Sequence, residues 1–288
     1  KNMKQKIIIA VITTLVFQGC IQTIAIRSMG EIFNNGIQSY MEEGDLQLAH
    51  ESLGSTLKLL ETMIKTDPKN TELLVYAAQG YQAYGLAFCE DDNVERARTF
   101  YLRGKEYGMR ALLNNKRFRN ALDGDLASFH NALTTFSKKD VPALFWTAFN
   151  WGSYINITRT DVSALADIGK VMEMIQRVIE LDSTYYYGAA YVFLGTLEAA
   201  TPKMLGGQPE KSKEYFEKAL SINNRKFLLT QLYFAKSYGV QMQDQELFDS
   251  LLTEVENASI DIVPECRLPN AIAKQKAQLL RAQENDLF

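Results

Sequence analysis

Apolar residues recur at helical spacing along most of the chain, in segments that short polar breaks separate. In residues 45–66 they follow one another at steps of three or four, which is the repeat of one face of an α-helix. The inward positions of this segment are Leu46, Ala49, Leu53, Leu57, Leu60 and Ile64. Asp67-Pro68 ends the segment, because the residue before a proline is pushed out of the α region. Only 6 prolines occur in 288 residues, so the pattern predicts an all-α protein.

The predicted helices fall into pairs. These are 28–41 with 45–66, 72–88 with a helix capped by Asn93, 187–200 with 209–223, and 228–238 with 246–256. Such pairs are typical of a tetratricopeptide-like α-solenoid, and an unrelated helical bundle is the alternative. The repeats are elongated: Gly80 to Ala97 and Gly195 to Ser212 each span 17 residues, where the common repeat has about 12.

Further helices complete the predicted array. They are an irregular helix or pair in 118–139, a helix from Pro142 to about 157, one from Asp161 or Ser163 to about Asp182, and a capping helix in 271–284. In the helix before Asp182, we expect Leu165, Ile168, Met172, Ile175 and Ile179 to face inward. Gly104 and Gly108 stand inside a helix, where glycine costs about 1 kcal/mol relative to alanine. We therefore expect a neighbouring helix to approach them closely.

The N-terminus has a different composition. Lys1, Lys4 and Lys6 precede an apolar run, residues 7–17, and then Gly19-Cys20. This order predicts a secretory signal in residues 1–19, because the run is too short to cross the ~30 Å hydrocarbon core of a bilayer. Gly19-Cys20 resembles a bacterial lipobox, in which Cys20 would receive lipid. The prediction is a helical domain in residues 20–288, anchored by lipid to a bacterial membrane in the periplasm; a secreted protein with a chance cysteine is the alternative.

Composition removes several classes of function. A net charge of −3 does not suit nucleic acid, which requires a strongly basic surface. His50 and His130 are the only histidines, and neither has a cysteine or second histidine at metal-ligand spacing. The chain carries no recognisable catalytic motif, so we predict no enzyme activity and no cofactor. Whether Cys89 and Cys266 pair stays open at this level.

One predicted helix is aromatic on most sides. Phe145, Trp146, Phe149, Trp151 and Tyr154 fall within ten residues, and both tryptophans of the chain are among them. Such a helix must be surrounded, either by protein alone or by protein and a ligand. It is therefore either the central core helix or the wall of an apolar ligand cleft.

A loop follows the helix predicted in 187–200. In it, Lys203 precedes Gly206-Gly207, and glycine allows backbone conformations closed to other residues. Lys203 is either the anion-attracting edge of a pocket or a lysine in water on an interhelical connector.

These two stretches carry a resemblance to a known family. The motifs L-F-W-x-A-x-x-W-G-x-x-I at 144–155 and P-K-x-x-G-G-x-P-E-x-S/A-x-x-x-F-x-x-A-L at 202–220 resemble the T component of tripartite ATP-independent periplasmic (TRAP) transporters, often written TatT. The likeness extends to about residue 256. The resemblance implies a helical-repeat lipoprotein that forms a ring-like trimer, associates with the TRAP substrate-binding protein and passes on a small hydrophobic or organic-acid ligand.

Carried onto this chain, the resemblance nominates Phe145, Trp146, Phe149, Trp151 and Tyr154 for the cleft wall. Lys203, Gly206 and Gly207 would lie near its edge. The leading hypothesis is thus an accessory solute-transport protein without chemistry of its own. A generic tetratricopeptide adaptor of the bacterial envelope is the alternative.

Overall fold

The computed structural model describes residues 23–24, 26–28, 30–158, 161–201 and 208–288, and in these ranges all regular secondary structure is helical. The predicted signal in residues 1–19, Cys20, Lys203, Gly206 and Gly207 lie outside the described residues. The all-α prediction is confirmed for the part of the chain that is described.

The first helices begin where their caps predict. The array opens with α2 (Gly30–Met41), α3 (Leu46–Thr66), α4 (Thr71–Phe88) and α5 (Val94–Leu112). The Asp45 carboxylate accepts from two backbone amides of α3, and the Asn70 and Asn93 side chains each accept one at the starts of α4 and α5. These side chains satisfy amides that the first turn of a helix leaves without partners. The predicted inward face of α3 is buried, except that Leu46 is only half-buried.

The middle of the chain has the helix pair predicted in 118–139 and the helix predicted from Pro142, and it departs from prediction in the segment before Asp182. It contains α6 (Lys116–Ala121), α7 (Leu126–Leu133), α8 (Val141–Ile157), α9 (Val162–Leu165) and α10 (Ile168–Asp182). The single helix expected before Asp182 is therefore two helices, because α9 ends after one turn. The break gives α10 its own register, and the expected inward face is wrong at two positions: Leu165 and Met172 are exposed. The buried residues of α10 are Val171, Met174, Ile175 and Val178.

The C-terminal part keeps the predicted pairing. It contains α11 (Tyr185–Ala200), α12 (Pro209–Asn223), α13 (Leu229–Tyr233), a π-helical stretch (Phe234–Gly239), α14 (Val240–Met242), α15 (Gln245–Asn257), α16 (Arg267–Ala282) and α17 (Glu284–Leu287). Ser212 and Phe216 are fully buried where α12 meets α11. The Ser212 hydroxyl donates to the Gly195 carbonyl at 2.7 Å, and the Phe216 ring lies against the bare face of Gly195.

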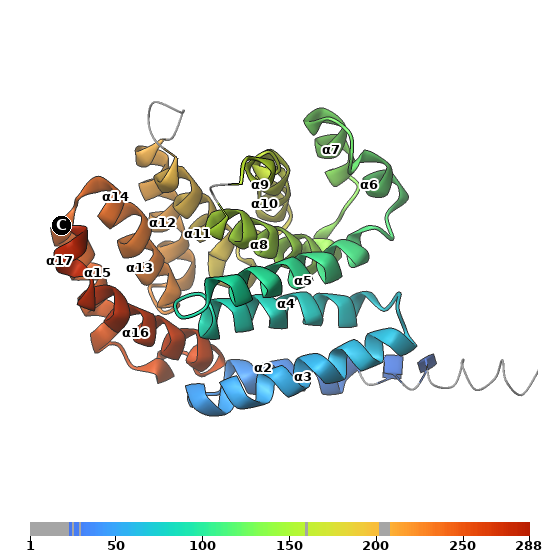
Figure 1. Cartoon of the computed structure of the whole chain (residues 1–288), viewed down its shortest axis with the longest axis horizontal. Helices are drawn as coiled ribbons and strands as arrows, with labels where there is room; N and C mark the ends of the chain where they lie inside the picture. The colour runs from blue at the N-terminus through green and yellow to red at the C-terminus, as the bar shows by residue number, and fades with distance from the viewer. Residues whose placement is uncertain (1–22, 25, 29, 159–160, 202–207) are drawn as a thin grey trace, which may run out of the picture.

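The helices form a curved array that returns to its beginning (Figure 1). From α4 to α12 the main packing partners are α4 with α5, α5 with α8, α8 with α10, α10 with α11, and α11 with α12. The last long helix, α16, then contacts α2 and α3. This order of contacts is consistent with a solenoid, and its closure surrounds a central space with helices from both ends of the chain.

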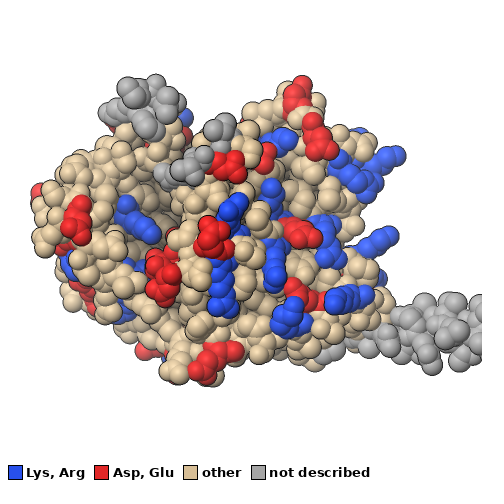
Figure 2. Space-filling model, in the orientation of Figure 1, with Lys and Arg blue, Asp and Glu red and all other residues tan. Residues whose placement is uncertain are grey.

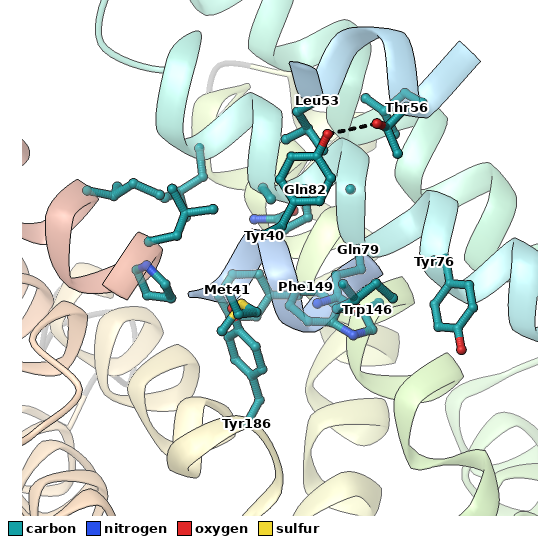
Figure 3. Close-up of a pocket in the computed structure, with 18 of the residues that line it drawn as sticks. Tyr40, Met41, Leu53, Thr56, Tyr76, Gln79, Gln82, Trp146, Phe149 and Tyr186 are labelled. Atoms are coloured by element: carbon teal, nitrogen blue, oxygen red, sulfur yellow. Dashed lines mark hydrogen bonds between the residues drawn. The ribbon is translucent and has the colours of Figure 1, made fainter. Parts of the chain in front are cut away.

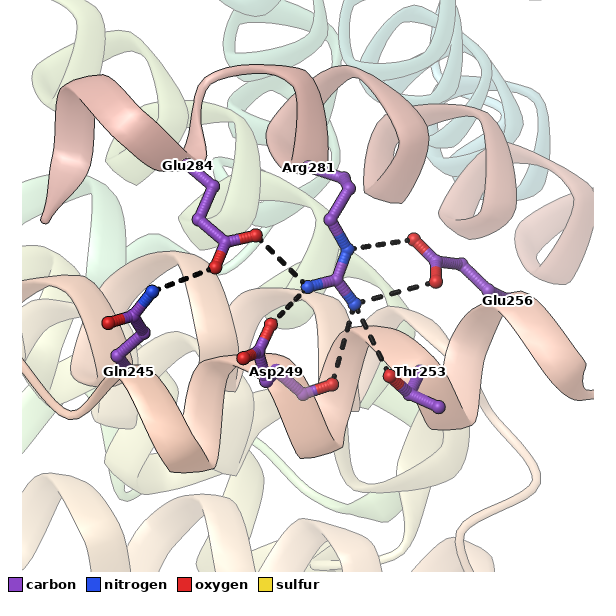
Figure 4. Close-up of polar contacts among 6 residues, drawn as sticks. All are labelled: Gln245, Asp249, Thr253, Glu256, Arg281 and Glu284. Carbon is purple, nitrogen blue, oxygen red and sulfur yellow. Dashed lines mark hydrogen bonds and ion pairs between the residues drawn. The ribbon is translucent and has the colours of Figure 1, made fainter.

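A polar cluster joins the final helices (Figure 4). The Arg281 guanidinium of α16 contacts the carboxylates of Asp249 and Glu256 on α15 and, at 3.2 Å, Glu284. Burial lowers the pKa of Arg281, but the hydrogen bonds to these carboxylates outweigh it and the net shift is upward. Gln245 donates to Glu284 at 3.0 Å. The cluster ties the capping helix to α15, so α16 holds its position against α2 and α3.

Candidate functional site

The aromatic helix α8 lies at the centre of the array and packs against α5 at very short range. A Cβ atom on Gly104 would lie 2.0 Å from Oδ1 of Asn150, and one on Gly108 would lie 2.2 Å from Oγ1 of Thr147. The predicted close approach at these two glycines is therefore confirmed. Asn150 is fully buried and its amide donates to the carbonyl of Ala78 on α4 at 2.9 Å. Helix α8 is thus fixed by α4 and α5 together.

The nominated aromatic residues of α8 divide between two environments. Trp151 and Tyr154 face α5, where the Lys105 ammonium lies 3.9 Å from the centre of the Trp151 ring and Arg98 lies over Tyr154. Phe145 is fully buried among other rings of the core. Only Trp146 and Phe149 line a cavity. The structure thus brings two of the five nominated residues together at an open space and places the other three in packing.

That space, the first cavity, has a volume of about 330 Å³ and lies beneath α2 (Figure 3). Its walls come from α2, α3, α4, α8, α11, α13 and α16, the helices that meet where the array closes. Lining residues include Phe33, Ile37, Tyr40, Met41, Leu57, Tyr76, Leu86, Trp146, Phe149, Tyr186, Leu229 and Ile272. No charged side chain is among the described residues that line it.

Several polar groups at this cavity have hydrogen-bond partners, whereas Oε1 of Gln82 is buried without one. The Tyr40 hydroxyl lies 2.7 Å from the Thr56 hydroxyl, the Trp146 indole donates to Tyr185 at 3.2 Å, and the Gln82 amide donates to Ser153 at 3.0 Å. Apart from a donor that reaches Oε1 of Gln82, a polar ligand group would have to break one of these hydrogen bonds or remain unpaired, which costs free energy in an apolar site. The first cavity is suited to an apolar body.

An unusual backbone segment supplies one wall. Tyr186, Tyr187 and Gly188 have φ values of 46°, 60° and 77°, in the left-handed region that side chains other than glycine rarely adopt. The Tyr186 ring packs edge-on against Trp146, with centroids 4.8 Å apart, and its hydroxyl lies 3.7 Å from the Met41 sulfur of α2. Burial raises the pKa of Tyr186 far above its ordinary value, so the hydroxyl stays neutral. Strain of this kind concentrates at functional sites, which makes Tyr186 a candidate ligand contact.

A second cavity, of about 480 Å³, adjoins the first. Leu86, Phe149, Val192 and Tyr233 line both cavities and form the partition between them. The remaining lining is mixed, with Phe193 and Leu197 beside Ser153, Thr196 and Thr201. Burial, with the negative charges of Glu90 and Asp91, raises the pKa of Tyr233 well above its ordinary value. The partition therefore consists of uncharged side chains.

Most of the cavity lining escaped the sequence analysis. The helical periodicity of residues 28–41 places Phe33, Ile37 and Tyr40 on one helix face, but it does not show that this face lines a cavity. Nothing in the local sequence points to Tyr186 or Tyr233, because only the closure of the array brings α11 and α13 against α2.

Basic residues gather on the outer surface of the array, on a helix that lines neither of the two cavities. Figure 2 shows lysine and arginine side chains gathered over the middle of this face, where α4 and α5 run. On α5, Arg96, Arg103 and Arg110 are spaced by seven residues and therefore share one helix face. Their guanidinium groups lie 5.3–5.9 Å from the ring centres of Tyr84, Tyr81 and Tyr107, respectively. We call these three arginines the basic stripe.

Other candidate chemistry is sparse in the described ranges. Cys89 and Cys266 are both buried and free, which answers the question of pairing. His50 stacks on Phe88, with ring centres 4.6 Å apart. In the part of the chain that the structure describes, no helix has the length and apolar character needed to span a bilayer.

Comparison with known proteins agrees with this architecture. Residues 42–288 match the family described as TRAP transporter T-component. An uncharacterized protein of Treponema pallidum (strain Nichols) is 26% identical over 266 residues, which cover 86% of this chain and 82% of that protein. Because the family match covers most of the sequence, the chain belongs to the TRAP transporter T-component family.

Proposed function

We propose that this T component is an accessory periplasmic lipoprotein that binds a small apolar ligand in the first cavity and exchanges it with a TRAP substrate-binding protein. The observation that carries the proposal is the cavity itself: apolar, lined by residues of seven helices and uncharged in its described lining. Ligand sites are typically concave and apolar with few polar groups. Family membership supports an accessory role in TRAP transport.

The second cavity provides an onward route in this proposal. Phe149 and Tyr233 belong to the lining of both cavities, so rotation of one ring would join the two spaces. Such a route would pass a ligand from one cavity to the other along a largely apolar lining. An organic-acid ligand is the other possibility from the sequence, and it depends on Lys203, which lies outside the described residues.

Docking and anchoring complete the proposal. We assign docking of the substrate-binding protein to the basic stripe, because a row of cations suits an acidic partner surface. Cys20 would carry the lipid anchor, and the chain would assemble as a homotrimer. The pairs α4–α5 and α11–α12 would be elongated tetratricopeptide-like units. None of these features requires catalysis.

The two tryptophans provide a test of ligand binding. Trp146 lines the first cavity, whereas Trp151 lies on the α5 side of the same helix, and no other tryptophan is present in the chain. In a Trp151→Phe variant the remaining Trp146 should change its emission when octanol is titrated. In a Trp146→Phe variant, Trp151 should respond little. Equal responses, or none in either variant, would reject the first cavity as the ligand site.

Docking is tested separately by analytical ultracentrifugation with the candidate substrate-binding protein. The native protein should sediment as a discrete oligomer that takes up the binding protein at fixed stoichiometry. Arg96→Glu with Arg103→Glu should abolish uptake, and Lys213→Glu on α12, exposed and far along the array, should not. Stable docking without any small ligand would favour the adaptor function instead.

A further inference from the structure

The second cavity has one charged residue among its described lining, Glu90. Its side chain is 16% exposed, and the buried Tyr101 hydroxyl donates to one carboxylate oxygen at 2.6 Å. The other oxygen has Lys236 at 3.9 Å, beyond ordinary hydrogen-bond distance. A carboxylate can accept about four hydrogen bonds, and in the described structure Glu90 accepts one, with Lys236 as a more distant ion-pair partner.

Helix electrostatics give no reason for an acidic residue at this position, and its one ion-pair partner in the described structure, Lys236, is 3.9 Å away. Glu90 lies two residues after the end of α4, next to the C-cap Cys89, and its amide donates to the carbonyl of Gly85 at 2.9 Å. The C-terminal end of a helix carries partial negative charge, so a carboxylate there is disfavoured and a lysine or arginine would stabilise the helix. Tyr101 alone could be satisfied by any neutral acceptor. The negative charge of Glu90 is therefore left with one distant counter-ion, Lys236, and with the cavity that it lines.

Glu90 lies close to the residues that the two cavities share. It lies one helical turn after Leu86, a residue of the partition. A ligand that passes the partition with its apolar body against Phe149 and Val192 would present one end near the carboxylate. Buried charge near a ligand is stabilised by a hydrogen-bond donor and opposes a second negative charge.

We infer that Glu90 makes the second cavity selective for an apolar molecule that ends in a hydrogen-bond donor, an alcohol or an amine, over one that ends in a carboxylate. This inference rests on the proposed ligand-binding function and narrows its ligand class. The apolar body satisfies the lining shared with the first cavity, and Glu90 accepts from the donor end. Glu90 is thus a specificity-determining residue and has no catalytic task.

The test is calorimetric titration of the full chain with octylamine, octanol and octanoate at neutral pH. These molecules share one apolar chain and differ in the end group. The native protein should bind octylamine at least about tenfold more tightly than octanoate, as expected for one charge-assisted hydrogen bond. If octanol binds about as tightly as octylamine, the hydrogen-bond donor is the source of the preference. If the affinity of octanol lies between those of octylamine and octanoate, charge contributes as well. Both results support the inference.

Matched variants assign the preference to one residue. Glu90→Gln keeps an acceptor for Tyr101 and should bring octylamine and octanoate within about threefold of each other. Asp92→Asn removes an exposed carboxylate two residues away, which is outside the cavity lining, and should keep the native preference. Circular dichroism of each variant verifies that the helical fold is retained.

Three results would overturn the inference while leaving the ligand function intact. They are equal binding of octylamine and octanoate by the native protein, a preference that survives Glu90→Gln, and a preference for octanoate that Lys203→Gln abolishes. Binding of none of the three molecules would instead reject the ligand function itself, and the inference with it.

Discussion

Two helices line the first cavity from opposite sides and are held in very different ways. In α8, eleven of seventeen residues are buried, and glycines of α5 admit its side chains at very short range. In α2, none of the twelve residues is buried, although Phe33, Ile37 and Tyr40 face the cavity. The same space therefore has one rigid wall and one lightly held cover.

The polar ties of α2 are few and peripheral. They include the Tyr40–Thr56 hydroxyl pair, a hydrogen bond from Tyr76 to Asn34 at 2.6 Å, and the contact of Tyr186 with Met41. Segments with little buried apolar contact open at lower free energy than the core of a domain. In the proposed function, a ligand would enter by displacement of α2, while α8 would keep the shape of the site.

Hydrogen exchange should show the largest difference between the two helices. Backbone amides in the middle of α2 are expected to open at a free energy lower than those of α8 by about 4 kcal/mol, or roughly a thousandfold in protection. Bound octanol should slow exchange in α2 and leave α8 unchanged. Equal protection of the two helices would contradict the description of α2 as a cover.

A pair of glycine substitutions sharpens the contrast. Gly108→Ala places a Cβ 2.2 Å from Oγ1 of Thr147 and 3.1 Å from its Cα, so α5 and α8 must separate; we expect a loss of about 2–3 kcal/mol of unfolding free energy. Gly36→Ala in α2 meets nothing within 4 Å and should gain about 0.5–1 kcal/mol through helix propensity. Urea denaturation measures both. A destabilising Gly36→Ala would show that α2 is packed more tightly than described.

The stability contributed by the hydrogen bonds of Glu61, on α3, should depend on pH. Tyr81 and Tyr107 donate to the Glu61 carboxylate at 2.6 and 3.1 Å. Burial raises the pKa of Glu61, but contacts with Lys58 and the two tyrosines outweigh it, and the net shift is downward. Because the folded pKa is depressed, this contribution is complete above the ordinary value of about 4.5 and is lost as pH falls through the lowered value.

Glu61→Gln should therefore cost about 1 kcal/mol at pH 7 and show a shallower loss of stability below pH 4.5 than the native protein. Thermal unfolding across this pH range provides the measurement. Parallel pH profiles for the two proteins would exclude Glu61 as a contributor.

The smallest change in stability is expected for a substitution in α2. Tyr40→Phe removes the hydroxyl that pairs with Thr56 and should reduce global stability by no more than about 0.5–1 kcal/mol. Its main consequence should be faster release of a bound ligand, because α2 opens more often. Stopped-flow measurement of octanol release distinguishes this from Thr62→Ala, a variant on the exposed side of α3 whose release rate should match the native protein.

The sequence and the structure agree best where local rules decide. Asn93 caps α5 and Pro209 starts α12, as the local sequence predicts. Gly104 and Gly108 allow the close approach of α8, as glycines inside a helix predict. The register of α10 could not be predicted, because a turn after Leu165 breaks the periodicity. The cavity was also beyond prediction: its lining joins α2 to α16, and closure of the array depends on packing between the ends of the chain. Of the α8 aromatics, periodicity alone could not separate Trp146 and Phe149 from Trp151.

The most direct test of ligand binding beneath α2 is a crystal structure of the protein grown with bromooctane, read from the anomalous signal of bromine. An apolar cavity of this size should hold the molecule. The expected result is bromine density inside the first cavity, between Met41 of α2 and Trp146 and Phe149 of α8. Saturated crystals with no bromine in this cavity, or with bromine only between neighbouring molecules, would contradict the proposed function.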